Sequence, residues 1–224
     1  MADASDRKLA VITGGQGGLG SALAAAFSEA GYQVEAPGRD RLDVTDEAQV
    51  NAFFAGLPRL DVLVHNAGHA ENVLFFKMPT ESFDRMLATH LRGGFFCARA
   101  ALKPMMKARR GHILMIGSRS ARTGPRGQTN YAPAKAGLEG LARSLAEEYG
   151  SRGIQCNVVL PGFLAGTKMT RDLPPERLQA HLDDCVLGAF NTVENAAQFI
   201  VKIAELELVS GQTFTLDSRI DAWI

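Results

Sequence analysis

The stretch that decides the fold of this chain is Leu9-Ala10-Val11-Ile12-Thr13-Gly14-Gly15-Gln16-Gly17-Gly18-Leu19-Gly20. Its apolar start is typical of a buried strand, and apolar residues at helical spacing begin at Leu19. The glycines between them let the backbone turn sharply and approach a phosphate without a Cβ in the way, while the helix N-terminus supplies positive potential. The stretch therefore predicts a cradle for the pyrophosphate of a dinucleotide.

Two glycine registers fit this cradle. Gly15, Gly17 and Gly20 match GxGxxG, whereas Gly14, Gly18 and Gly20 match TGxxxGxG. A P-loop for nucleoside triphosphates is disfavoured, because no Gly-Lys-Ser/Thr follows to contact the terminal phosphates and magnesium. The stretch thus favours a dinucleotide and leaves the register open.

Short apolar runs alternate with longer segments of helical periodicity, which predicts an α/β fold: a Rossmann-type doubly wound parallel sheet in a three-layer αβα arrangement. At 224 residues, the whole chain (1–224) is expected to form one dinucleotide-binding and catalytic domain. Expected strands are 9–13, 33–36, 42–44, 60–65, 112–116, 155–160 and 213–216, and expected helices are 18–30, 47–55, 81–107, 129–149, 175–183 and 193–206. Because only residues 38–41 separate the second strand from the third, the helix that normally follows the second strand is expected to be missing.

Composition limits the partners and the compartment. Lys and Arg total 24 and Asp and Glu total 24, so no overall charge favours nucleic acid or an anionic membrane surface. No run approaches the roughly 20 apolar residues that a membrane span needs, and the N-terminus lacks the apolar core of a signal peptide. Cys97, Cys156 and Cys185 are scattered without metal-like spacing. We therefore expect a cytoplasmic protein that binds no metal, nucleic acid or membrane.

A second informative group of residues lies further along the chain. Ser118 closes the expected strand 112–116, at the carboxyl end of the sheet where ligands bind in such folds. Tyr131 and Lys135 are spaced to share one face of a helix. A nearby ammonium stabilises a phenolate and so lowers the pKa of a tyrosine, which suits proton transfer. We expect Ser118 to orient a substrate oxygen, Tyr131 to transfer the proton, and Lys135 to tune Tyr131 and bond the nicotinamide ribose.

The end of the second strand bears on which dinucleotide is bound. An acidic residue there would select NAD through the ribose 2′-hydroxyl, whereas an arginine would accommodate the 2′-phosphate of NADP. Arg39 favours NADP by its charge and its bidentate fit to phosphate. Glu35 and Asp40 leave NAD open, and a solvated surface charge is the alternative for Arg39. We expect NADP (NADPH) in preference to NAD.

Taken together, these motifs resemble those of the short-chain dehydrogenase/reductase family, most nearly its 3-oxoacyl-(acyl carrier protein) reductase branch, over nearly the whole chain. The family's TGxxxGxG implies the register of Gly14, Gly18 and Gly20, and Ser118, Tyr131 and Lys135 have the family's catalytic spacing. Asp43-Val44 resembles the pair that contacts adenine, and Asn66-Ala67-Gly68 resembles the family's NAG motif. The cofactor-binding residues that the resemblance implies are Gly14, Gln16, Gly18, Leu19, Gly20, Arg39, Asp43, Val44, Asn66, Ala67, Gly68, Tyr131, Lys135, Pro161, Gly162 and Thr167.

Several positions depart from the family pattern. His90 stands where the family has a catalytic asparagine that holds a water between the lysine and bulk solvent. We expect His90 either to bond that water as a titrating catalytic group or to be a packed polar residue. His65 replaces the first asparagine of the common NNAG, a smaller change, and Gly38 occupies the position where NAD-preferring relatives carry an acid.

The resemblance also implies partners. Arg109 and Arg152 fall where the carrier-protein reductases present basic residues to an acidic acyl carrier protein, and the alternative is that both are solvated surface charges. The expected helices 81–107 and 129–149 resemble those that pair subunits in this family, so a homodimer or homotetramer is expected. Trp223 is a candidate for that interface, and the alternative is that it is a local surface anchor.

The function implied by the resemblance is an NAD(P)H-dependent ketoreductase that transfers hydride to a ketone or 3-oxoacyl carbonyl, with Tyr131 as proton donor. Two alternatives stay open. One is an NAD-dependent alcohol dehydrogenase. The other is a cofactor-binding regulatory protein with little turnover, which His90 and the short adenosine side would suit. The segment 163–188, expected to cover the substrate, carries no diagnostic charge pattern.

Overall fold

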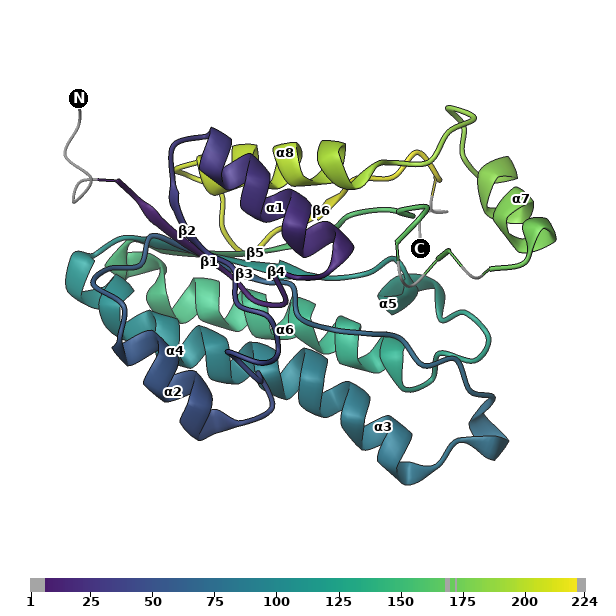
Figure 1. The fold of residues 1–224 in the computed structure, drawn as a ribbon, viewed down its shortest axis with the longest axis horizontal. Coiled ribbons are helices and arrows are strands. Elements are labelled where there is room, and N and C mark those ends of the chain that lie inside the picture. The colour runs from purple at the N-terminus through teal and green to yellow at the C-terminus, as the bar shows by residue number, and fades with distance from the viewer. Residues whose placement is uncertain (1–6, 168–169, 172, 221–224) are drawn as a thin grey trace.

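The computed structural model describes residues 7–167, 170–171 and 173–220, and its centre is a parallel sheet between two layers of helices (Figure 1). The 6-stranded sheet has the order β2-β1-β3-β4-β5-β6, and every neighbouring pair is parallel. The Rossmann-type α/β fold expected from the sequence is therefore confirmed. The strands are β1 (Leu9–Ile12), β2 (Gln33–Glu35), β3 (Val62–His65), β4 (Gly111–Ile116), β5 (Ile154–Leu160) and β6 (Thr213–Thr215).

Helices cover both faces of the sheet. Helices α1 (Gly18–Glu29) and α8 (Val193–Ala204) pack together on one face, and α2 (Glu47–Ala55), α4 (Gly93–Ala108) and α6 (Tyr131–Tyr149) cover the other (Figure 1). Because successive strand residues point to opposite faces, the four central strands β1, β3, β4 and β5 contribute to two separate cores. Along β1, Val11 belongs to the core under α2, α4 and α6, whereas Ala10 and Ile12 belong to the core under α1 and α8.

The expected strand at 42–44 does not form. The chain turns instead at Gly38, whose carbonyl accepts the backbone N–H of Leu42 at 3.0 Å, and α2 then begins behind the N-cap Asp46. Leu42 and Val44 are buried in the core, which explains their strand-like pattern without a strand. Because that strand is absent, α2 is the helix that follows β2, and it is the crossover that carries the chain to β3. The expectation of a missing helix after the second strand is therefore wrong.

The long helix expected over 81–107 is interrupted. It consists of α3 (Thr80–Met86), a π-helical segment (Leu87–Arg92) and α4. Such π turns insert extra backbone into a helix and frequently mark functional sites. The sequence pattern also missed the short helix α5 (Ser120–Thr123), whereas α7 (Pro175–Asp183) has the expected bounds.

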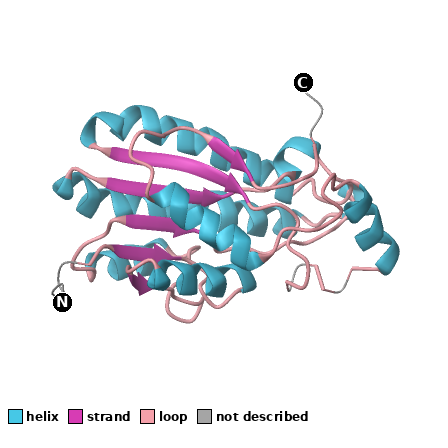
Figure 2. Cartoon of the chain, turned by 90° about the horizontal axis from the view of Figure 1, so that it is seen from above, coloured by secondary structure: helices cyan, strands magenta, loops and turns pink. Residues whose placement is uncertain are grey.

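The sheet winds in two directions from β1. The chain passes from β1 to β2 on one side and then returns to β3 on the other, so the loops after β1 and β3 meet at the carboxyl edge. Ligands bind at this kind of switch point in doubly wound sheets. Figure 2 shows the connecting loops gathered at one end of the strands, close to α7. Within the described part of the chain, no helix is both long and apolar enough to cross a membrane.

Replacement of Gly20 tests how tightly the loop after β1 is packed. A Cβ at Gly20 would lie 2.2 Å from the carbonyl oxygen of Gly14, so backbone must move to admit it. We expect Gly20→Ala to lower the free energy of unfolding by about 1–3 kcal/mol, the usual range for overpacking. The matched change Gly140→Ala, on the exposed face of α6 with nothing within 4 Å, should raise it by about 1 kcal/mol. Urea denaturation measures both, and equal effects of the two changes would contradict the close approach at Gly20.

Candidate active site

The glycine loop after β1 is tied to the loop after β3. The hydroxyl of Thr13 accepts the backbone N–H groups of Asn66 at 3.1 Å and Ala67 at 3.0 Å. The side-chain amide of Asn66 donates in turn to the carbonyls of Thr13 at 3.1 Å and Gly14 at 3.3 Å. These four bonds hold the two loops together as one rigid edge.

This edge fits the pyrophosphate of a dinucleotide. Helix α1 has Gly17 at its N-cap, and no side chain caps its first turn or places an acidic group there. Gly17 and Gly18 are exposed, and the Gly17 N–H donates to the Gly14 carbonyl at 3.1 Å, whereas the first N–H groups of the helix itself have no side-chain cap. Uncapped N–H groups and the helix dipole together favour an anion. Leu19 is partly buried against the core under α1, which anchors the helix end.

The adenosine side is lined by a short charged turn. The side chain of Arg39 is 85% exposed, and its Nε donates to Asp43 at 3.0 Å. Gln16 donates to Asp40 at 3.2 Å and lies against Gly38, where a Cβ would be 2.2 Å from its side chain. Burial would raise the pKa of Asp43, but bonds from Thr45 and Arg39 outweigh it and hold that pKa below its usual value. Val44 is buried where Gly93 approaches it, so it forms the floor beneath this turn.

Ser118, Tyr131 and Lys135 converge at the carboxyl edge. Ser118 follows the end of β4, while Tyr131 and Lys135 lie on the first two turns of α6. The Tyr131 side chain hydrogen bonds with that of Ser118. Lys135 Nζ donates to the Ile116 carbonyl at 2.6 Å and lies 5.7 Å from the centre of the Tyr131 ring. All three side chains predicted from the sequence are thus brought together.

The protonation equilibria of this group differ from those expected. Burial raises the pKa of Tyr131, and the hydrogen bond with Ser118 offsets only part of the effect. Burial also lowers the pKa of Lys135 to about 7. The expected lowering of the Tyr131 pKa by Lys135 is therefore wrong. Lys135 directs its ammonium at the Ile116 carbonyl and lies over the Tyr131 ring, and burial dominates the titration of both groups.

His90 lies in the π-helical segment and reaches the same site. Its ring is perpendicular to that of Tyr131, with the centres 5.1 Å apart, and it is fully buried. Its Nε2 bonds the His69 carbonyl at 2.7 Å, whereas its buried Nδ1 has no hydrogen-bond partner among the described residues. Burial, with a further contribution from Lys135, lowers the pKa of His90 well below its ordinary value. His90 is therefore a neutral ring near pH 7, and the expectation of a titrating group is wrong.

Sequence reasoning missed Asn130, the residue that fixes the start of α6. Asn130 is fully buried, and its Oδ1 accepts the backbone N–H of Tyr131 at 2.8 Å. Its Nδ2 donates to the Glu71 carbonyl at 3.2 Å and to the Ser82 hydroxyl at 3.1 Å. Asn130 therefore joins Tyr131 to the loop after β3 and to α3. The preference of asparagine for helix N-caps was the signal available in the sequence.

The segment after β5 closes the other side of the site. Asn191 donates to the carbonyls of Pro161 at 3.0 Å and Leu216 at 3.2 Å. Gly162 has φ +83°, and a Cβ there would lie 2.4 Å from the Leu216 carbonyl oxygen. Thr167 then lies beside the start of α1, 3.6 Å from the Cβ position of Gly18. The neighbouring Lys168 and Met169, like Trp223, lie outside the described residues.

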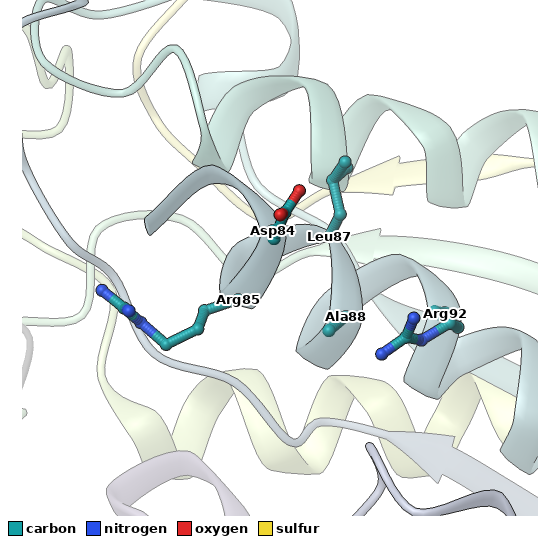
Figure 3. A pocket seen from close by; sticks show the side chains of 5 residues that line it. All are labelled: Asp84, Arg85, Leu87, Ala88 and Arg92. Atoms are coloured by element: carbon teal, nitrogen blue, oxygen red, sulfur yellow. The ribbon is translucent and has the colours of Figure 1, made fainter. Parts of the chain in front are cut away.

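A hollow on the surface lies away from this edge. A hollow of about 510 Å³ is lined by Asp84, Arg85, Leu87, Ala88 and Arg92 on the outer side of α3 and the π-helical segment (Figure 3). His90 belongs to the same segment but is buried against Tyr131, so this hollow is not the candidate site. The described residues contain no cluster of ligands suited to a metal ion.

Arg109 and Arg152 lie at the opposite edge of the sheet. Arg109 lies two residues before the start of β4 and Arg152 two residues before the start of β5, whereas Ser118 follows the end of β4. Since β4 has 6 residues, its two ends are about 20 Å apart. Arg109 also donates to the Ser151 carbonyl at 3.2 Å. The structure therefore does not bring the two arginines to the active-site edge of their own chain.

Comparison with known proteins agrees with this geometry. A family model described as enoyl-(acyl carrier protein) reductase matches residues 35–218. The chain is 36% identical to a 3-oxoacyl-(acyl-carrier-protein) reductase of Escherichia coli (strain K12), over 92% of this chain and 94% of the relative. It is 32% identical to the enzyme of that name from Chlamydia muridarum, over 94% and 96%. The solved structure of sorbitol-6-phosphate 2-dehydrogenase from Erwinia amylovora superposes with a TM-score of 0.88 at 25% identity, covering 93% of this chain and 98% of that one. The chain belongs to the short-chain dehydrogenase/reductase family, and its curated relatives fall in the 3-oxoacyl-(acyl-carrier-protein) reductase branch.

Proposed function

We propose that this protein is an NADPH-dependent reductase of a ketone or 3-oxoacyl carbonyl, with Tyr131 as the proton donor. Membership of the family makes it an oxidoreductase that acts on CH–OH or C=O groups. The observation that carries the finer proposal is the convergence of Ser118, Tyr131 and Lys135 beside an uncapped helix N-terminus. When bound, the nicotinamide cofactor supplies the hydride.

Different residues at the carboxyl edge would bind different parts of the cofactor. The uncapped N–H groups at the start of α1, with Gly14 and Gly20 at the turn, would hold the pyrophosphate. Asp43 and Val44 would contact the adenine, with Asn66, Ala67 and Gly68 along the adenosine side. Lys135 would bond the nicotinamide ribose, and the segment with Pro161, Gly162 and Thr167 would contact the nicotinamide. Gln16, Gly18 and Leu19 complete the phosphate turn.

Tyr131 is suited to donate a proton to a carbonyl oxygen. Because its pKa is raised, the phenol is protonated at neutral pH and available as a general acid. Ser118, already bonded to Tyr131, would hold the same carbonyl oxygen in line with that proton. Lys135, with a pKa of about 7, can return a proton to Tyr131 after each turnover, since its protonated and neutral forms are both populated.

His90 would take the place of the family's asparagine with a narrower hydrogen-bonding capacity. The His69 carbonyl can only accept, so it fixes the proton of the neutral ring on Nε2 and leaves Nδ1 as an acceptor. A water molecule bonded to Nδ1 would donate to it and keep its other hydrogen and lone pairs for neighbouring groups. His90 thus orients a proton carrier without itself changing charge.

The charges at the adenosine side favour NADP. Both acids that left NAD open are engaged, Glu35 with Arg41 at 3.1 Å and Asp40 with Gln16 at 3.2 Å. Arg39 is exposed and held by a surface ion pair, which is weak in water and readily exchanged for a phosphate. Gly38 offers no acid for a ribose 2′-hydroxyl. Arg39 would therefore bind the 2′-phosphate.

The substrate class follows from the relatives. Those named above reduce 3-oxoacyl groups on acyl carrier protein according to their names, which supports an acyl thioester for this chain. Docking of the carrier on Arg109 and Arg152 would require a second subunit to supply the active site, because these arginines lie at the amino edge. The dehydrogenase name of the structural neighbour favours oxidation of an alcohol as the competing function.

Replacement of Tyr131 tests the proton donor. We expect Tyr131→Phe to lower kcat/KM for NADPH-dependent reduction of a 3-oxoacyl thioester by about 10²–10⁴-fold, the usual contribution of a general acid. The dissociation constant for NADPH should stay within about twofold. Tyr149→Phe, at the far end of the same helix, serves as the matched control and should retain activity. Full activity of Tyr131→Phe would contradict the assigned role.

Replacement of Arg39 tests cofactor choice. Arg39→Ala removes the proposed partner of the 2′-phosphate, so we expect the dissociation constant for NADPH to rise by about tenfold, as for loss of a charge-assisted bond, while that for NADH stays constant. Arg143→Ala removes an exposed arginine from α6 and controls for overall charge. Calorimetry with both cofactors gives the answer, and an unchanged preference in Arg39→Ala would refute the role of Arg39.

A further inference from the structure

His65 is a buried side chain that the proposed chemistry does not use. It is the last residue of β3, it is 1% exposed, and its ring lies between the phosphate loop and the π-helical segment. Its Nδ1 is 3.3 Å from the Thr13 hydroxyl, and its Nε2 is 3.0 Å from the His90 carbonyl. One imidazole therefore links the residue that braces the glycine loop to the residue that packs on Tyr131.

The direction of both hydrogen bonds follows from their partners. The His90 carbonyl can only accept, so His65 Nε2 carries the proton and donates it. The Thr13 oxygen already accepts two backbone N–H groups, from Asn66 and Ala67, so its own proton is free to go to His65 Nδ1. Burial, followed by the nearby charge of Lys135, lowers the pKa of His65 to about 4. The ring is thus neutral, with each nitrogen committed to one partner.

The neighbouring backbone packs closely around the His65 and His90 rings. A Cβ on Gly94 would lie 3.1 Å from His65 Cδ2 and 3.3 Å from its Nε2, so a glycine at the start of α4 lets the helix approach the imidazole. On the far side, the His90 ring lies directly against Gly68, where a Cβ would be 2.1 Å from its Cε1. The position of the His90 ring thus depends on where the π-helical backbone is held.

We infer that His65 is a positioning residue, which holds the His90 carbonyl at a set distance from Thr13 and thereby fixes the His90 ring against Tyr131. The chain of contacts runs from the phosphate loop through Thr13, His65 and His90 to Tyr131. The effect on catalysis rests on the proposed function, whereas the structural link does not.

Variants of His65 separate positioning from simple filling of space. His65→Leu keeps a buried apolar group but removes both hydrogen bonds, and His65→Gln retains a donor for the His90 carbonyl. His112→Leu is the matched control, because His112 is also buried, at 3% exposed, has its pKa lowered to about 4 by burial, and bonds Asn157 at 2.8 Å in the neighbouring strand. Any loss of stability that comes simply from removing a buried histidine should appear in both leucine variants.

Hydrogen–deuterium exchange of the backbone amides of residues 88–94 is the primary readout, since it needs no activity. We expect His65→Leu to raise exchange there by about tenfold, as for loss of one hydrogen bond, His65→Gln to restore much of the protection, and His112→Leu to leave it unchanged. If His65→Leu does not fold, His65→Gln and the wild type still decide the case: imidazole nitrogen NMR of the wild type should show His65 protonated on Nε2 at pH 7. Unchanged exchange in His65→Leu, or a proton on Nδ1, would overturn the inference.

Steady-state kinetics test whether His65 affects catalysis. With NADPH and a 3-oxoacyl thioester, His65→Leu should lower kcat about tenfold or more with a smaller change in KM, and His112→Leu should not. Wild-type kcat in a His65→Leu protein whose exchange has increased would overturn positioning of Tyr131 through His65. Complete inactivity of the wild-type protein would instead count against the proposed function, and the exchange measurement would still decide the role of His65.

Discussion

The reversal of strand order between β1 and β3 is the constraint on which the rest of this structure depends. It brings the loops after two separate strands to one point at the carboxyl edge, and the Thr13 hydroxyl ties them together by accepting two backbone N–H groups. Once these loops are fixed, the uncapped start of α1 faces an open edge. The same point lies beside Ser118 and Tyr131, so the proposed phosphate cradle and the proposed proton donor lie at one edge of the sheet.

Burial determines the protonation of the side chains at that edge. Lys135 has a carbonyl rather than a carboxylate as its hydrogen-bond partner, and the two nearby histidines, His65 and His90, are kept neutral. Desolvation without a compensating charge raises the pKa of Tyr131 and lowers that of Lys135. A protonated phenol beside a lysine that titrates near neutral pH suits reduction, in which a proton must be given to the carbonyl oxygen and then replaced.

The sequence predicted those parts of the fold that depend on local pattern. The strand, glycine turn and helix of residues 9–29 and the spacing of Tyr131 and Lys135 on α6 are short-range features and were found. The strand predicted at 42–44 was wrong because Leu42 and Val44 are buried in a core, and burial gives the same apolar pattern as a strand. The π-helical segment was not predicted, because the backbone hydrogen-bond pattern that defines a π turn is not set by any one residue type. The hydrogen bonds of His65 and Asn130 join residues far apart in sequence, so no local pattern signals them.

Transfer of deuterium from NADPH labelled at C4 of the nicotinamide tests the central claim most directly. The protein would be given each of the two labelled stereoisomers with a 3-oxoacyl thioester, and the hydroxyl product would be examined by mass spectrometry. A crevice that binds the cofactor in one orientation beside Tyr131 predicts deuterium on the carbinol carbon from one stereoisomer and none from the other. Product without deuterium from either stereoisomer, or no oxidation of NADPH at all, would contradict the account.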